Sequence, residues 1–288
     1  MAQMISGAEL QDARDRRYRR QPALRLAGER DALQFLNDVG ISLLFSARSI
    51  ELPTLWGAIC GEDRPVPRHH DDHELGLAWQ WKDTIPGRRE VLYGKFLKGR
   101  PVFISLDLAP NFYALSDNYG DPEDYLNAYH AGLMSEEAKR VYESLLEKGP
   151  LPTSQLRREA GITSKGAAKY FDRAITELQM SYQIVKTGIS DANRWGYCYV
   201  YDLFVRHFPN LVAEARHIRQ DDAAATILTR YLATVYAAKP ATIGRLLGWD
   251  AWRLQRTIEQ VIAAGCIAGG VRIEGQAGDF IVHTSLLS

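Results

Sequence analysis

The most informative part of the chain is Ser164–Tyr201, with the sequence SKGAAKYFDRAITELQMSYQIVKTGISDANRWGYCYVY. Its first half places apolar residues at helical spacing: Ala167, Phe171, Ala174, Ile175 and Leu178. This spacing predicts an amphipathic helix that begins at Thr163 or Ser164, either of which can cap it. Its second half predicts two strands, 182–187 and 197–201, joined by a polar turn. The stretch is therefore expected to form a helix followed by a hairpin.

The same order of elements is predicted on both sides of this stretch. Before it, Ser135 is a good helix start and Gly149 a good helix stop, and a short helix follows Thr153. Towards the C-terminus we expect a helix over 223–237, a short helix that ends at Leu247, a helix capped by Asp250, and strands over 267–274 and 279–282. Towards the N-terminus we expect a helix over 29–39, a short helix near Pro53, and strands over 91–96 and 101–105.

Repetition of one pattern indicates a chain of similar units. The predicted fold class is mainly α with small β-hairpins (α+β), arranged as tandem winged helix-turn-helix units. The expected divisions are an Arg-rich N-terminal segment, a first winged-helix-like unit with a basic hairpin, and a second and third winged helix: 1–26, 27–131, 132–210 and 218–288. The Arg-rich segment is expected to be a solvated helix or a mobile arm.

Composition limits the classes of protein to consider. The chain has 288 residues, with 35 Lys plus Arg and 35 Asp plus Glu, so no overall positive field indicates a nucleic-acid partner. Its three cysteines lie far apart, which favours a reducing compartment over a disulfide framework. No apolar run is long enough to span a membrane, and no secretory signal is evident. We expect a cytoplasmic monomer.

Helix-turn-helix units place their second helix in the major groove of DNA. Lys165, Lys169 and Arg173 lie opposite the apolar face of the predicted helix, where they could bind phosphates. A basic face can also be simply a solvated face, and winged helices also bind proteins. Double-stranded DNA, damaged or undamaged, is nevertheless the predicted partner.

A denser group of cations and aromatic residues lies between Trp79 and Arg100. Side chains of this kind suit phosphate binding and stacking on unpaired bases, and the predicted contacts are Trp81, Arg88, Arg89, Lys95, Lys98 and Arg100. Trp79, Tyr93 and Phe96 lie among them, and the alternative is that such aromatic residues form the core of the first unit. The hairpin tip at Lys98 is a candidate wedge or backbone anchor.

Two runs carry a resemblance to a known family: LLFSARSIELPTLWGAI, Leu43–Ile59, and LYGKFLKGRPVFISLDLAPNFYAL, Leu92–Leu115. They resemble the first winged helix of the AlkZ-like (YcaQ-type) DNA glycosylases. The later predicted units also resemble those of the family in their order and length, so the resemblance covers nearly the whole chain. The chain looks like a divergent, AlkZ-related member of that family. The resemblance implies a protein that excises alkylated or crosslinked bases.

The catalytic motif of that family is missing. Members of that family resemble one another in a Gln-x-Gln or Gln-x-Asp motif just before a Leu-Pro pair. When this chain is aligned on Leu52 and Pro53, Arg48 and Ile50 occupy the motif positions. Ile50 cannot position water, and Arg48 would repel a cationic sugar, although it could bind a phosphate. Catalysis is therefore an open question.

Nearby residues offer substitutes for the missing motif. Glu51 and Asp83 could orient water, and Lys82 could form a Schiff base at an abasic sugar. The alternative is that Lys82 and Asp83 are surface charges at a helix end. Two further functions remain open: a transcription regulator that reads an operator, and a protein-interaction scaffold.

The segment RHHDDHE, Arg68–Glu74, contains residues that commonly bind metals. Adjacent His69 and His70 point different ways on most backbones, and the surrounding prolines and charges are typical of a solvent loop. We predict no metal site and no cofactor.

Overall fold

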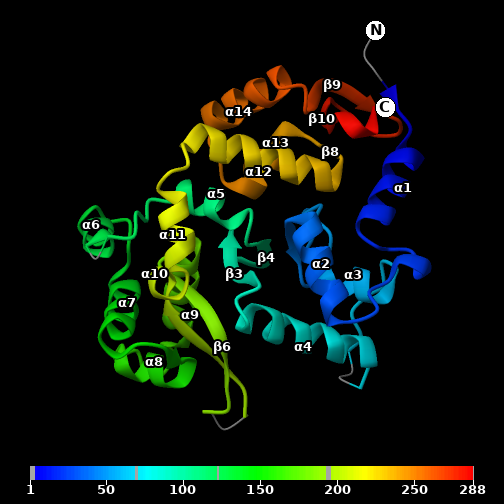
Figure 1. Ribbon diagram of the computed structural model, residues 1–288. Helices are drawn as coiled ribbons and strands as arrows, with labels where there is room; N and C mark the ends of the chain where they lie inside the picture. Colours follow the sequence, from blue (N-terminus) through cyan, green and yellow to red (C-terminus); the bar gives the residue numbers. More distant parts are fainter. Residues whose placement is uncertain (1–3, 69–70, 122, 193–195, 288) are drawn as a thin grey trace.

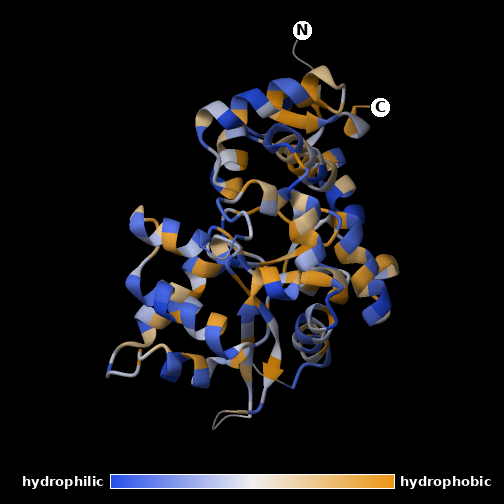
Figure 2. Cartoon of the chain, turned by 60° about the vertical axis from the view of Figure 1, so that its left-hand side comes forward, coloured by the Kyte–Doolittle hydropathy of each residue, from blue (hydrophilic) through white to orange (hydrophobic). Residues whose placement is uncertain are grey.

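The computed structural model describes residues 4–68, 71–121, 123–192 and 196–287. The chain has an α+β fold in which helices surround three small sheets (Figure 1). Its helices carry hydrophobic and hydrophilic residues side by side, as expected where one face is buried (Figure 2). In the described part of the chain, no helix has the length and apolarity needed to cross a membrane.

The first sheet has the strand order β2-β4-β3. The elements of this part are α2 (Glu29–Val39), β2 (Ile41–Leu43), α3 (Leu55–Cys60), α4 (His73–Gly87), β3 (Val91–Leu97), β4 (Arg100–Ser105) and α5 (Ala109–Ala114). The predicted 29–39 helix, the short helix after Pro53 and the hairpin are confirmed. Lys98 and Gly99 form the two-residue hairpin turn with φ of 51° and 68°, a geometry that matches the twist of paired strands.

The second sheet has the strand order β5-β7-β6. Its part of the chain contains α6 (Asp124–His130), α7 (Glu136–Lys148), β5 (Leu151–Pro152), α8 (Thr153–Glu159), α9 (Ala168–Met180), β6 (Ile184–Ser190), β7 (Cys198–Leu203) and α10 (Phe204–His207). The predicted start of α9 was wrong: the helix begins at Ala168, so neither Thr163 nor Ser164 caps it. Gly166 has a φ of +86°, which no α-helix accommodates. Lys165 therefore lies outside the helix.

The third sheet has the strand order β1-β9-β10-β8. Its part of the chain contains α11 (Pro209–Ala215), α12 (Gln220–Val235), β8 (Ala237–Ala238), α13 (Pro240–Leu247), α14 (Ala251–Ala263), β9 (Ile267–Ile273), β10 (Phe280–His283) and a 3-10 turn (Thr284–Leu286). The predicted cap is confirmed, because the Asp250 carboxylate accepts a hydrogen bond of 2.7 Å from the Arg253 amide.

The N-terminal segment forms a helix, one of its two expected states, but one face of that helix is buried rather than solvated. The segment forms β1 (Met4–Ile5), α1 (Gly7–Arg17) and a 3-10 turn (Pro22–Leu24). β1 pairs in parallel with β9, and Leu10, Ala13 and Tyr18 are buried. The arginines of α1 lie among these apolar residues, and the segment packs on the third sheet. The Arg16 side chain is 59% exposed, whereas that of Arg14 is only 13% exposed.

One apolar core connects elements that are distant in the sequence. Phe96 of β3 stacks on Tyr182 with ring centroids 4.9 Å apart, and it contacts Phe204 edge-on at 6.3 Å. The same cluster continues through α12 into β9 and β10. Because this core is shared, the first hairpin is fixed between the other two parts of the chain. The division into three units stays a prediction.

Candidate nucleic-acid interface

A tight turn follows β2 at the positions where the family motif would lie. The Ile50 amide donates to the Ala47 carbonyl at 3.1 Å, and Ser49 between them has a φ of +64°. A left-handed serine costs free energy, and such strain is concentrated at binding and catalytic sites. The turn holds Arg48 at its corner and leads through Glu51 into Thr54, the cap of α3.

The tip of the β3–β4 hairpin lies between two helices. A Cβ at Gly99 would be 3.0 Å from Thr176 Cγ2 of α9, and a Cβ at Gly248, after α13, would be 3.3 Å from Lys98 Nζ. The tip therefore contacts both elements, and this packing fixes the direction in which the exposed side chains of Lys98 and Arg100 leave the hairpin. Its role as a wedge or backbone anchor stays a prediction.

The turn, the hairpin and α13 together enclose a pocket of about 610 Å³. Its lining is rich in cations and comes from three separate parts of the sequence: Arg48, Ser49, Ile50, Glu51, Lys98, Arg100, Thr242, Arg245 and Leu246. We call this the basic pocket. Four of its nine lining side chains are cationic and one is a carboxylate.

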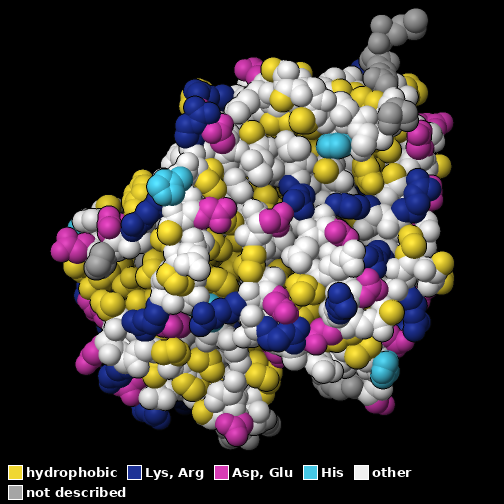
Figure 3. All heavy atoms as spheres, viewed as in Figure 1, with side chains coloured by type: hydrophobic (Ala, Val, Ile, Leu, Met, Phe, Trp, Pro, Cys, Tyr) yellow, Lys and Arg dark blue, Asp and Glu magenta, His cyan; other side chains and the backbone are white. Residues whose placement is uncertain are grey.

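The cations of the basic pocket have no acidic partner in the described structure, where no ion pair joins Arg48, Lys98, Arg100 or Arg245 to a carboxylate. Glu51 instead pairs with Arg14 of α1, with 3.4 Å between Nη1 and Oε2. On the face shown in Figure 3, cations and acids are interspersed. The basic pocket is thus a local concentration of unpaired positive charge on a chain with no net charge.

Sequence reasoning found some of these residues and missed others. Arg48, Lys98, Arg100 and Glu51 were predicted and lie together in the basic pocket. Arg245 was missed, because one arginine on a short amphipathic helix carries no distinctive signal in the sequence. Its place in the site comes from the packing of α13 beside the hairpin.

Several predicted DNA contacts lie elsewhere. Trp81 is 4% exposed and belongs to the core around α4, so it cannot stack on a base. Arg88 pairs with Glu90 at 2.8 Å and with Glu29 at 3.3 Å, so its charge is already compensated. Arg89 is exposed.

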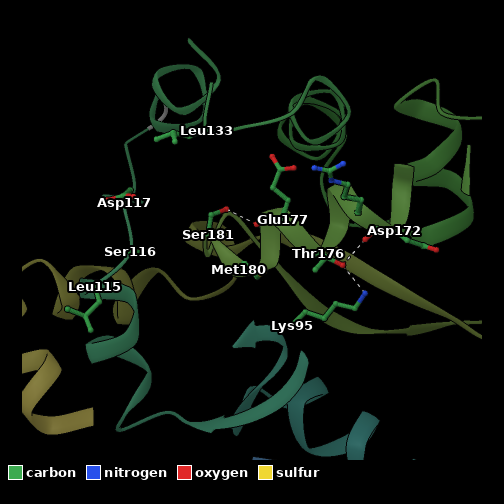
Figure 4. A pocket seen from close by; sticks show the side chains of 11 residues that line it. Lys95, Leu115, Ser116, Asp117, Leu133, Asp172, Thr176, Glu177, Met180 and Ser181 are labelled. Atoms are coloured by element: carbon green, nitrogen blue, oxygen red, sulfur yellow. Dashed lines mark hydrogen bonds between the residues drawn. The ribbon is translucent and has the colours of Figure 1, made fainter. Parts of the chain in front are cut away.

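Lys95 and Arg173 line a separate cavity of about 770 Å³ between α9 and the segment after α5 (Figure 4). Lys95 Nζ donates to Thr176 Oγ1 at 2.9 Å. Asp117, Asp172 and Glu177 line the same cavity, so its carboxylates outnumber its two cations. This charge balance is unfavourable for phosphate. Lys165 and Lys169 are exposed, and DNA contact by them stays a prediction.

Lys82 and Asp83 are not surface charges at a helix end. They lie inside α4, with side chains 0% and 10% exposed. Lys82 Nζ donates to Asp83 at 2.8 Å, to the Tyr197 hydroxyl at 2.7 Å and to the Tyr199 hydroxyl at 3.0 Å. Lys186 of β6, 2% exposed, forms an ion pair with the same Asp83 oxygen. We call these five residues the lysine–tyrosine cluster.

Burial and the charges within this cluster shift the pKa values of Asp83 and Lys186. Burial alone would raise the pKa of Asp83, but hydrogen bonds and charges from Lys186 and Lys82 hold it below its usual range. Burial lowers the pKa of Lys186 to about 8, and the nearby Lys82 charge acts in the same direction. The hydrogen bond and charge of Asp83 raise the pKa of Lys186 and offset part of this effect. Asp83 thus stays ionised between two lysines, and the cluster joins α4 to the β6–β7 hairpin.

In the described part of the chain, no three His, Cys, Asp or Glu side chains are grouped as metal ligands. His69 and His70 of the sequence RHHDDHE lie outside the described residues. Asp72 has a structural role, because it caps α4 by accepting from the Leu75 amide at 2.9 Å and pairs with Arg64 at 2.6 Å.

Comparison with known proteins gives the family of the chain. The model of the AlkZ-related family matches residues 27–248. No curated protein matches the chain. Among solved structures, the DNA glycosylase AlkZ of Streptomyces sahachiroi is similar, with 14% sequence identity and a TM-score of 0.58 over 98% of this chain and 71% of that one. Since the family match covers most of the sequence, the chain belongs to the AlkZ-related family.

Proposed function

We propose that this protein is a DNA-binding protein of the DNA-repair type that holds the phosphate backbone of double-stranded DNA in the basic pocket. The single observation that carries the proposal is the convergence of Arg48, Lys98, Arg100 and Arg245 without acidic partners. Phosphates attract such cations strongly, because binding releases condensed counterions from DNA. Similarity to a DNA glycosylase supports the same partner. We infer a cytoplasmic monomer whose helix-and-hairpin units act as winged helices.

The proposal concerns binding rather than base excision. Of the three predicted catalytic residues, Lys82 and Asp83 are buried in the lysine–tyrosine cluster, where hydrogen bonds and ion pairs engage both. Glu51 lies in the basic pocket but pairs with Arg14. Ile50 offers no polar group at its motif position. These contacts favour a role in which the protein recognises DNA without cleaving the glycosidic bond.

Salt dependence tests the proposal. The triple variant Arg48→Gln/Lys98→Asn/Arg245→Gln removes three cations of the pocket, and asparagine suits the positive φ of Lys98. Each lost phosphate contact lowers the slope of log K against log salt by about 0.9, so the slope should fall by about 2 to 3. Fluorescence anisotropy of a short labelled duplex at several salt concentrations measures it.

A matched control removes three cations that already have acidic partners. Lys139, Lys148 and Arg272 pair with Glu143, Glu159 and Asp279. Their triple change to Gln alters the net charge by the same amount and should leave the slope close to wild type. Equal losses in the two triple variants would show that binding depends on overall charge alone, and would contradict the proposal.

A further inference from the structure

A second pocket of about 350 Å³ lies beside the basic pocket and differs from it in chemistry. Its lining is mostly apolar and aromatic: Leu43, Leu44, Phe45, Ala47, Trp79, Tyr93, Arg100, Pro101 and Tyr199. We call this the aromatic pocket. A volume of this size is typical of sites that hold a small organic group, and apolar walls with one charged residue suit a planar ring.

The aromatic walls come from separate elements and are partly open to solvent. Phe45 follows β2, Trp79 belongs to α4 and Tyr199 to β7. Phe45 meets Trp79 edge-on, with ring centroids 5.7 Å apart and planes at 64°. Trp79 is 41% exposed, which is unusual for so large an apolar ring. An exposed tryptophan at the edge of an aromatic pocket is available to stack on a ligand.

The lysine–tyrosine cluster holds these walls in place. Lys82 Nζ lies 4.9 Å from the ring centroid of Trp79 and 4.9 Å from that of Tyr199. Lys186 Nζ lies 4.3 Å from the Tyr199 ring. Cation–π attraction and the hydrogen bond from Lys82 to the Tyr199 hydroxyl therefore fix the two rings before any ligand arrives. Rings ordered in advance lose little conformational entropy on binding.

The two pockets are adjacent. Arg100 lines both of them, and Ala47 of the aromatic pocket is bonded directly to Arg48 of the basic pocket. A ligand that spans both would carry a flat, uncharged ring next to a negatively charged group. A nucleotide unit within a DNA strand has this composition.

We propose that the aromatic pocket holds one unpaired nucleobase of a DNA strand whose neighbouring phosphate is bound in the basic pocket. This proposal rests on the proposed function and adds its substrate class: duplexes that contain a base without a partner. An unpaired base costs little to take out of the stack, and stacking on an aromatic side chain compensates for that cost. The protein would then distinguish damaged or mispaired sites from intact duplex.

The test compares two duplexes of equal length and phosphate number. One contains 2-aminopurine opposite thymine, and the other contains 2-aminopurine opposite an abasic analogue. Wild-type protein should bind the second duplex more tightly and quench its fluorescence as the base stacks. Trp79→Ala should weaken binding of the second duplex about 5- to 100-fold, leave the first unchanged, and abolish the additional quenching. Trp79→Phe should restore most of the preference.

Trp252→Ala is the matched control, because Trp252 is 65% exposed on α14 and lines neither pocket. It should keep the preference of wild type. The base-binding proposal is overturned if wild type binds both duplexes equally, or if Trp79→Ala retains the preference. Failure of the proposed function is a different result, in which neither duplex binds with an affinity that depends on salt and on the cations of the basic pocket.

Discussion

At the scale of single residues, burial determines what a charged side chain can do in this protein. Lys82 and Arg48 are both cations that the sequence places near a candidate site. Lys82 is fully buried and hydrogen-bonded, so it stabilises the junction of α4 with the β6–β7 hairpin. Arg48 lines an open pocket without an acidic partner, so its charge is available to a ligand. The same residue type therefore has a structural role in one place and a binding role in the other.

His207 provides a test of burial at this scale. It is 7% exposed, and its Nε2 has no hydrogen-bond partner in the described structure. Burial lowers its pKa to about 4, and the Arg89 charge acts in the same direction. The unfolded chain has a histidine pKa of about 6.5, so between these values the unfolded state binds the extra proton. The contribution of His207 to stability is present above that window and is lost as the pH falls through it.

From pH 7 to pH 5 this single group should remove about 2 kcal/mol of the free energy of unfolding. Urea unfolding at the two pH values measures the loss in wild type and in His207→Leu, which cannot take up the proton. The difference between the two proteins isolates His207 from the carboxylates. His217→Gln changes an exposed histidine and should behave like wild type. A His207→Leu variant that loses as much stability as wild type would contradict this account.

At the scale of elements, sequence patterns identified helices and hairpins well where the controlling interaction is local. Ser135, Gly149 and Asp250 bound their helices as predicted, because caps and stops depend on a few neighbouring backbone groups. The start of α9 was misplaced because a good cap residue, Ser164, precedes a glycine with positive φ. Packing of the N-terminal strand on β9 was missed, because a pairing between chain ends leaves no local signal.

The cap at Ser135 is a test at this scale. Its side chain accepts from the Ala138 amide, and its amide and hydroxyl both donate to Glu177 of α9, at 2.7 and 2.8 Å. Ser135→Ala should lower the free energy of unfolding by about 1 to 2 kcal/mol, because a cap and a hydrogen bond to a carboxylate are lost together. Ser164→Ala, at the exposed serine that was expected to cap α9, should change it by less than about 0.5 kcal/mol. Equal effects in urea unfolding would contradict the assignment of the two caps.

At the scale of the whole molecule, the candidate site exists because distant segments pack together. Lys98 and Arg100 could be predicted as part of a basic hairpin, and Arg48 could be predicted from its place before Leu52 and Pro53. Arg245 could not, since about 150 residues separate it from the hairpin and the sequence gives no measure of that distance in space. The aromatic pocket likewise needs β7 to pack against α4, which depends on the buried lysines.

Arg14 tests how this packing is held together, because it connects three parts of the chain. From α1 it donates to the carbonyls of Val235 and Ala237 at 2.9 and 2.8 Å, and it pairs with Glu51 of the basic pocket at 3.4 Å. Its side chain is 13% exposed. Arg14→Ala removes two charge-assisted hydrogen bonds and leaves the carbonyl oxygens without partners, so the free energy of unfolding should fall by about 2 to 4 kcal/mol.

Arg14→Lys should recover part of this loss but not all of it, because one ammonium group cannot reproduce the spread of the guanidinium. Arg16→Ala is the matched control on the same helix: its pair with Asp12 is exposed, with side chains 59% and 54% accessible, and such pairs contribute at most about 1 kcal/mol. Urea unfolding should therefore rank the proteins as wild type, Arg16→Ala, Arg14→Lys and Arg14→Ala, in falling order of stability. If Arg14→Ala were as stable as Arg16→Ala, α1 would be held by its apolar residues alone, and Arg14 would not be the link between the chain ends and the basic pocket.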